Sequence, residues 1–189
     1  MTRRLNPDKE LQAYVIGLAL GDGNLSNPNG RATRLRISCD AKYPLLINQI
    51  KRSLIKLLPD NAVSQALRPR HCIEVSCYSN YWEDLLGWFA TGGSKMGQNA
   101  HAPLWVFDKK NYIINCLRGL IETDGSIYFD RSYPMVMFVN IVADLAVDVR
   151  IMMESLGFRP KLYSLPTVYH VRLSREVKQF LQLVQPLKA

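Results

Sequence analysis

The sequence predicts an α+β fold built from two pseudo-symmetric halves, each running helix, strand, strand, helix, strand, strand, helix. The first observation is a pair of stretches that read alike: residues 14–23 are YVIGLALGDG and residues 116–125 are CLRGLIETDG. The second is that the same order of helical and alternating patterns follows each stretch. Because the two copies lie 102 residues apart, we interpret the chain as one unit written twice.

The first half is expected to span residues 1–92. It opens with Asn6-Pro7-Asp8, a helix-start signal, and Asp22-Gly23 ends the first helix. Residues 33–38 alternate polar and apolar side chains, which indicates a half-exposed strand. The predicted helices cover residues 9–21, 45–58 and 81–89, and the predicted strands cover 24–27, 33–38, 63–67 and 72–77.

The second half, residues 111–189, repeats this order. Its predicted helices cover 112–123, 145–156 and 176–184, and its predicted strands cover 126–129, 136–142, 161–165 and 169–173. Between the halves, residues 93–110 form a linker that contains the apolar run Leu104-Trp105-Val106-Phe107. Because this run is too apolar for a free tether, we expect the linker to pack on both halves.

The composition excludes several classes of protein. With 24 Lys and Arg against 16 Asp and Glu the net charge is +8, which favours a polyanionic partner such as nucleic acid. No apolar run approaches the ~20 residues that cross a bilayer, and no apolar signal region follows the basic N-terminus. The four cysteines show neither zinc spacing nor a disulfide framework. We therefore expect a protein of a reducing compartment, cytoplasmic or organellar matrix, with no membrane partner.

The duplicated helices are expected to pack against each other. Gly17 and Gly21 lie one turn apart on one helix, and Gly119 and Thr123 repeat that spacing on the other. Small residues at this spacing let two helix backbones approach closely. A single such pattern is typical of ordinary core packing. Two copies, each followed directly by Asp-Gly, indicate that the interface has a functional role beyond packing.

That role is suggested by the two acids, Asp22 and Asp124. Each follows the last turn of its helix, where unpaired carbonyls and the helix dipole already make the environment negative. Such a placement costs stability unless a cation binds. Mg²⁺ prefers oxygen ligands, commonly one or two carboxylates with phosphate and water. The pair therefore predicts a divalent-metal site in which the carbonyls of Gly21 and Thr123 are further ligands.

With these motifs the chain resembles the LAGLIDADG homing endonucleases, in their single-chain, two-motif form, over nearly its whole length. The third, eighth and ninth motif positions are filled by Gly17, Asp22 and Gly23 in the first copy, and the third, sixth, eighth and ninth by Gly119, Glu122, Asp124 and Gly125 in the second. Two positions depart from the pattern. Leu20 stands where the family has an acid, and Arg118 is unusual, so we expect its side chain to point away from the interface.

The resemblance implies a saddle of two antiparallel β-sheets above the central helix pair. The saddle would sit on the major groove of a long, partly palindromic DNA site. Two or three divalent ions, Mg²⁺ with Mn²⁺ or Ca²⁺ able to substitute in binding, would be held by Asp22 and Asp124 across the minor groove. Metal-assisted hydrolysis would then cut both strands and leave 3′ overhangs. The protein would act in intron homing as a monomer.

The resemblance also implies supporting residues near the metals. A polar residue at the end of the second strand of each half falls on Cys39 or Asp40 and on Asn140. A lysine after the third helix of each half falls on Lys95 and Lys188, for which the alternative is a solvated surface charge. If Cys39 replaces a glutamine-like residue, the two strands are expected to be cut at different rates.

Specificity is expected from outward residues of the strands and their turns, where arginine can recognise guanine bidentately. The candidates in the first half are Arg31, Arg34, Arg36, Ser38, Arg68, Arg70, Glu74 and Ser76, and those in the second are Asp130, Arg131, Lys161, Tyr163, Tyr169 and Arg172.

Two other functions stay open at this stage. The same fold can serve as an RNA-splicing maturase, with intron RNA as a partner, or as a DNA-binding regulator that does not cleave. Loss of one or both acids would have favoured binding alone, and both are present. A basic protein whose repeat merely packs is a third, more remote interpretation.

Overall fold

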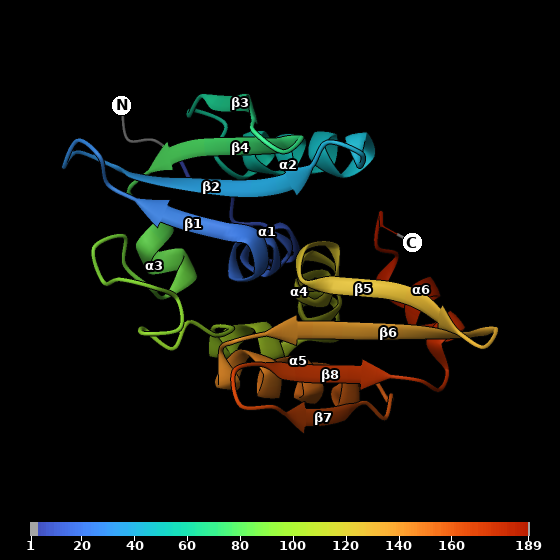
Figure 1. Cartoon of the computed structure of the whole chain (residues 1–189). Coiled ribbons are helices and arrows are strands. Elements are labelled where there is room, and N and C mark those ends of the chain that lie inside the picture. The colour runs from blue at the N-terminus through green and yellow to red at the C-terminus, as the bar shows by residue number, and fades with distance from the viewer. Residues whose placement is uncertain (1–3, 189) are drawn as a thin grey trace.

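The computed structural model describes residues 4–188, which form two four-stranded antiparallel sheets in front of a layer of helices (Figure 1). The first half contains α1 (Lys9–Asp22), β1 (Gly23–Ser26), β2 (Thr33–Asp40), α2 (Pro44–Leu57), β3 (Val63–Arg68), β4 (Cys72–Ser79) and α3 (Trp82–Leu86). The second contains α4 (Lys110–Thr123), β5 (Gly125–Asp130), β6 (Tyr133–Asn140), α5 (Ala143–Ser155), β7 (Lys161–Ser164), β8 (Tyr169–Leu173) and α6 (Val177–Val184). The predicted α+β fold with two equivalent halves is confirmed.

The two sheets have the same topology. Their strand orders are β1-β2-β4-β3 and β5-β6-β8-β7, so each half joins two hairpins through their second and fourth strands. The registers are equivalent as well, because Gly23 after α1 pairs with Ile37 and Gly125 after α4 pairs with Phe138. Residues 33–39 of β2 therefore have counterparts 101 positions later in β6.

The central helices explain why the acids end up at one place. Asp8 begins α1, and its carboxylate accepts hydrogen bonds from the amides of Glu10 and Leu11. From Gln12 to Leu20 every residue of α1 is buried, because α4 covers one side and the first sheet and α2 cover others. The sheets contribute their inner faces to the same core, with Leu35 and Ile37 in one half and Val136 and Phe138 in the other.

Most predicted elements agree with the structure to within two residues at each end, and two differ by more. The helix predicted at 81–89 is only Trp82–Leu86, because Gly87 adopts a left-handed conformation with φ of 79° and stops it. The strand predicted at 136–142 is Tyr133–Asn140. Its early start follows from a tight two-residue hairpin turn, in which Arg131 and Ser132 both have positive φ. Its end follows from the Asn140 side chain, which accepts a hydrogen bond from the amide of Val142.

The segment between the halves forms a 3₁₀ helix, η1 (Leu104–Asp108), beside the start of α4. Trp105 of η1 meets Tyr112 of α4 edge to face at 5.7 Å, and the Lys9 ammonium of α1 lies 4.3 Å from the centre of the Trp105 ring. This segment thus contacts both central helices. Within the described part of the chain, no helix has the length and apolar character needed to cross a membrane.

Candidate metal centre and nucleic-acid interface

The α1–α4 contact is a backbone-to-backbone contact made possible by glycine. A Cβ atom on Gly119 would lie 2.5 Å from the carbonyl oxygen of Tyr14 and 2.6 Å from the amide nitrogen of Leu18. Gly17 has equally little space, facing the carbonyl of Cys116. Gly21 faces the side chain of Thr123, whose hydroxyl donates back to the carbonyl of Gly119 at 2.8 Å.

This contact brings the C-terminal ends of both helices together. Asp22 is the last residue of α1, and Asp124 directly follows α4. The pKa of Asp124 is raised to about 6, mainly by burial and also by the charge of Asp22, although the hydrogen bond from the Asn140 amide at 2.6 Å acts to lower it. Asp22 is more open, yet the surrounding protein displaces enough water to raise its pKa too.

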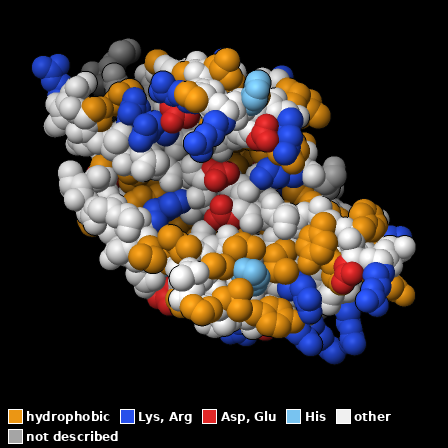
Figure 2. Space-filling view, in the orientation of Figure 1, with side chains coloured by type: hydrophobic (Ala, Val, Ile, Leu, Met, Phe, Trp, Pro, Cys, Tyr) orange, Lys and Arg blue, Asp and Glu red, His pale blue; other side chains and the backbone are white. Residues whose placement is uncertain are grey.

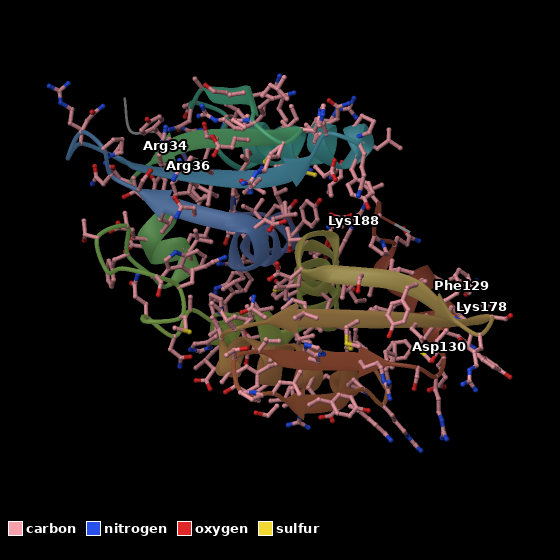
Figure 3. The ribbon with its side chains drawn as sticks, viewed as in Figure 1. Arg34, Arg36, Phe129, Asp130, Lys178 and Lys188 are labelled. Atoms are coloured by element: carbon pink, nitrogen blue, oxygen red, sulfur yellow. The ribbon has the colours of Figure 1, made fainter. Side chains whose placement is uncertain are left out.

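Two lysines cap the same helix ends. The Lys95 ammonium donates to the carbonyls of Ala19, Leu20 and Gly21 at the end of α1. The Lys188 ammonium donates to the carbonyl of Thr123 at the end of α4, at 2.8 Å, and Figure 3 shows it in the space between the two sheets. Each lysine thus places a positive charge at the negative end of a helix, close to the motif acids.

The charges pair crosswise. Of the two lysines, Lys188 lowers the pKa of Asp22 more, while Lys95 lowers the pKa of Asp124 more. Burial in turn lowers the pKa of Lys95 against the attraction of both acids. Asp22 is therefore stabilised mainly by a lysine at the end of the second half, and Asp124 mainly by a lysine of the segment between the halves.

The two halves differ in the residue beside each acid. The register makes Cys39 the counterpart of Asn140, because Ile37 and Phe138 are equivalent and each lies two residues earlier. Asn140 donates to Asp124, whereas the Cys39 thiol is buried and points to the carbonyl of Asp40 at 3.7 Å. Burial raises the pKa of Cys39 to about 11, which keeps the thiol neutral near pH 7. Asp40, the alternative in the sequence, is exposed and pairs with Lys42.

A buried cluster that sequence reasoning missed holds the site together. Glu122 accepts hydrogen bonds from the Tyr14 hydroxyl at 2.6 Å, from the Leu187 amide at 2.9 Å and from Arg118 at 3.2 Å. The Leu187 contact fixes the segment that carries Lys188. Arg118 lies 5.6 Å from the Tyr14 ring centre, so its expected orientation away from the interface is wrong. The acid at the sixth motif position was the signal that could have pointed to this cluster.

A groove opens beside the acids. The cavity of about 460 Å³ is bounded by the end of α1, by β1, by the segment around Lys95 and by residues 139–142 after β6. Asp124, Asn140 and Lys95 all line it. The site therefore has room for a charged ligand between the two halves.

The donors present fit a hard divalent cation. Among the described residues no cluster of three or more His, Cys, Asp or Glu side chains could hold a metal ion. The two acids therefore do not form part of a zinc-type site built from side chains alone. The two carboxylates are instead accompanied by helix-terminal carbonyls that already attract ammonium groups. Mg²⁺ takes carboxylate, carbonyl, water and phosphate oxygens as ligands. The two acids and the backbone carbonyls supply the first two kinds, and the groove has room for water and phosphate.

The outer faces of the sheets carry most of the predicted DNA-contact residues. In the first sheet the outward positions alternate with buried Leu35, Ile37, Val75 and Cys77, and they include Arg34, Arg36, Ser38, Arg68, Glu74 and Ser76. Glu74 forms ion pairs with Arg68 at 2.6 Å and with Arg36 at 3.9 Å. In the second sheet the outward positions include Asp130, Lys161, Tyr163 and Arg172.

Arg31, Arg70 and Arg131 lie exposed in turns between strands. Tyr169 does not face outward. It has the same parity in β8 as buried Val171 and Leu173, and it packs against the core. The prediction that Tyr169 faces outward is therefore wrong. In a strand of only five residues, the alternation of polar and apolar side chains does not show which face is the inner one.

Residues 111–185 match the model of the LAGLIDADG-like domain family. A comparison with curated proteins finds no match.

The whole chain has the LAGLIDADG fold of solved structures. Variants of the homing endonuclease I-DmoI align with a TM-score of 0.69 at 17% identity, over 96% of this chain and 97% of theirs. I-DmoI in complex with DNA and Mn aligns with 0.69 at 18% identity, over 93% and 96%. The N-terminal LAGLIDADG domain of DUF199/WhiA aligns with 0.63 at 12% identity, over 95% and 83%. These likenesses establish the LAGLIDADG fold for both halves.

Proposed function

We propose that this protein is a site-specific, metal-dependent endonuclease of double-stranded DNA that acts as a monomer. The observation that carries the proposal is the meeting of Asp22 and Asp124 at the ends of two glycine-packed helices, with a lysine beside each acid and a sheet on either side. Retention of both acids favours cleavage over a binding-only regulator. The I-DmoI complexes with DNA and Mn support the same assignment.

When bound, the divalent cations, Mg²⁺ in our proposal, supply an activated water and neutralise charge on the scissile phosphate and the leaving oxygen. Asp22 and Asp124 would hold these cations with the carbonyls of Gly21 and Thr123. Asn140 orients the Asp124 carboxylate and favours its charged form. The sheets would lie in the major groove, so that the acids face the minor groove and cuts on the two strands leave 3′ overhangs.

The lysines have a second task in this proposal. The Lys95 and Lys188 ammonium groups occupy the carbonyls of Gly21 and Thr123 that the cations would use. On metal binding each ammonium would leave its carbonyl and remain within reach of a phosphate oxygen in the groove. The lysines thus serve as counter-charges before binding and as phosphate contacts after it.

The test is cleavage of a plasmid library that carries random inserts. With Mg²⁺ we expect double-strand cuts within one recurring sequence, with short 3′ overhangs at the sequenced ends, and no cuts in EDTA. DNA binding should weaken steeply with salt. Salt-dependent duplex binding without cuts in Mg²⁺ or Mn²⁺ would favour the regulator, and preferential binding of structured intron RNA would favour the maturase.

Replacing Lys95 with Met should tighten Ca²⁺ binding roughly 3- to 10-fold, because it removes both a like charge and a competitor for the helix-terminal carbonyls. Cleavage in Mg²⁺ should nevertheless fall. Calorimetric Ca²⁺ titration measures the first effect. Lys178→Met is the matched control, because it makes the same charge change at an exposed position of α6. Unchanged or weaker Ca²⁺ affinity in Lys95→Met would contradict this role.

Cys39→Asn should make the two strands cleave at similar rates. In the native protein the Asp22 side lacks a partner like Asn140, so we expect one strand to be cut roughly 10-fold more slowly and nicked plasmid to accumulate. The time course of supercoiled, nicked and linear plasmid measures this difference. Cys72→Asn, the same change elsewhere in the first sheet, should leave the native pattern. Equal strand rates in the native protein would refute the prediction.

A further inference from the structure

The outer faces of the two sheets are chemically different at equivalent positions. The registers of the β1–β2 and β5–β6 pairs make Arg34 equivalent to Met135 and Arg36 equivalent to Met137. Both arginines point outward between buried residues of β2, and both methionines do the same in β6. Two hydrogen-bond donors in one half are therefore replaced by two apolar side chains in the other.

The first sheet is polar over this face. Arg34 donates to the hydroxyl of Ser26 at 3.4 Å and lies 5.7 Å from the Tyr78 ring centre. Arg36 faces Glu74, which also pairs with Arg68. Figure 3 shows Arg34 and Arg36 side by side on the upper sheet. Their guanidinium groups are held in place without being enclosed, as groups that recognise guanine must be.

The second sheet carries an apolar strip along the same line. The strip consists of outward Tyr133, Met135, Met137 and Val139 of β6, with Tyr128 beside it in β5. Val139 and Tyr128 are each 37% exposed, and Tyr133 is 70% exposed. Figure 2 shows hydrophobic side chains over the lower sheet where the upper sheet carries basic ones.

The cations of the second half lie outside the β6 row, although Arg172 of β8 is the register partner of Met137. Arg172 is committed to Tyr163, because its guanidinium donates to the phenol oxygen at 2.8 Å and lies 5.2 Å from the ring centre. Arg131 sits in the hairpin turn and Lys161 on the outer strand β7. Arg131 and Lys161 are placed to hold phosphates at the edges, and the contact with Tyr163 directs the Arg172 guanidinium toward the outer strand β7, so the β6 row itself carries no arginine.

The strip continues the surface that carries the arginines. Both sheets face the same way, and acidic side chains lie between them in the middle of that face (Figure 2). Positions related by the pseudo-twofold are therefore presented alike to one ligand that spans both sheets. An exposed apolar row of this length marks a binding surface, and its basic margin favours a polyanion as the occupant. We take that occupant to be the DNA duplex of the proposed function.

Apolar side chains recognise a base edge in one main way. In the major groove the C5-methyl group of thymine is the apolar feature, whereas guanine presents two acceptors that need donors. A methionine or valine pressed against guanine would leave those acceptors without a partner, which is unfavourable. Met135, Met137 and Val139 thus favour thymine and disfavour G·C pairs.

We propose that the target is chemically asymmetric, with guanines read by Arg34 and Arg36 in the half-site under the first sheet and thymine methyl groups read by the β6 strip in the half-site under the second. This inference rests on the proposed function, because it requires that DNA lies across both sheets. It identifies Met135, Met137 and Val139 as residues that determine specificity, none of which the sequence pattern had indicated.

The first test is selection of duplexes from a random pool in Ca²⁺. We expect one enriched sequence whose two halves differ, guanine-containing on one side and A·T-rich on the other. Met135→Arg with Met137→Arg should change the preference of the A·T-rich half alone, and Arg34→Met with Arg36→Met that of the other half alone. Enrichment of one sequence with equal base content in both halves overturns the inference and leaves the proposed function standing. If no duplex is enriched, both fail.

The second test needs no variant of the protein. Deoxyuridine lacks only the methyl group of thymine, so its use throughout the A·T-rich half should weaken binding roughly 5- to 100-fold, whereas the same change in the guanine half should have little effect. 7-Deazaguanine, which lacks the N7 acceptor, should act in the opposite half. Unchanged affinity for the deoxyuridine duplex would show that the strip serves another occupant, such as a protein or a second copy of this chain.

Discussion

Asp22→Asn and Asp124→Asn should each reduce the cleavage rate by a factor on the order of 10³ or more while duplex binding persists. Each change removes a carboxylate that holds a cation at the scissile phosphate, and such polarisation contributes several kcal/mol to the transition state. Binding should persist because the sheets are not altered. Plasmid cleavage and salt-dependent binding measure the two properties separately.

The same substitution at Asp124 should increase stability in the absence of metal. The folded-state pKa is raised from 3.8 to about 6, so the folded protein binds this proton more tightly than the unfolded chain. The stability that the native acid contributes is thus complete below about pH 4 and lost as the pH rises through 6. Asp124→Asn should therefore match the native protein at low pH and exceed it by about 1–3 kcal/mol above pH 7.

Asp40→Asn is the matched control for both effects. It makes the same charge change on the same side of the molecule, but hydrogen bonds with Lys42 hold the pKa of Asp40 below its usual value. Its loss should therefore lower stability slightly and leave cleavage intact. Ca²⁺ should raise the melting temperature of the native protein and of Asp40→Asn, and not that of the two motif variants. Full cleavage by Asp124→Asn would remove the basis of the proposed function.

Much of the central arrangement could be predicted from the sequence because it is local. Both copies of the motif contain small residues followed by Asp-Gly. This pattern predicts where each helix ends and which of its faces packs closely against the other helix. Element order followed from periodicity. Asn140, and Cys39 with Asp40 as its alternative, were placed near the acids by family resemblance, and the strand registers then identify Cys39 as the counterpart of Asn140. The two lysines were placed after the third helices by family resemblance alone.

What the sequence could not show depends on distant contacts or on strand parity. The hydrogen bond from the Tyr14 hydroxyl to Glu122 joins residues 108 positions apart, and no local sequence pattern near either residue predicts it. The tight turn at Arg131-Ser132 uses residues that are not typical of such turns, so β6 was placed three residues late and its outward row was missed. Tyr169 was assigned to the wrong face for a similar reason.

Gly119→Ala tests the helix contact on which both acids depend. Alanine normally stabilises a helix by about 1 kcal/mol relative to glycine. Here its Cβ would lie 2.5 Å and 2.6 Å from backbone atoms of α1, so the helices must separate. We expect a net loss of about 2–4 kcal/mol, or a fall in melting temperature of roughly 5–15 °C, measured by thermal unfolding.

The control for this variant is Gly97→Ala, because the nearest atom to its Cβ would be the hydroxyl of Ser94 at 3.3 Å, and this side chain can move. If the helices separate, the carboxylates of Asp22 and Asp124 separate with them. The cleavage rate per folded molecule of Gly119→Ala should therefore be lower than that of the native protein. A variant as stable and as active as the native protein would mean that α1 and α4 do not touch at this glycine. The spacing of the acids would then need another explanation.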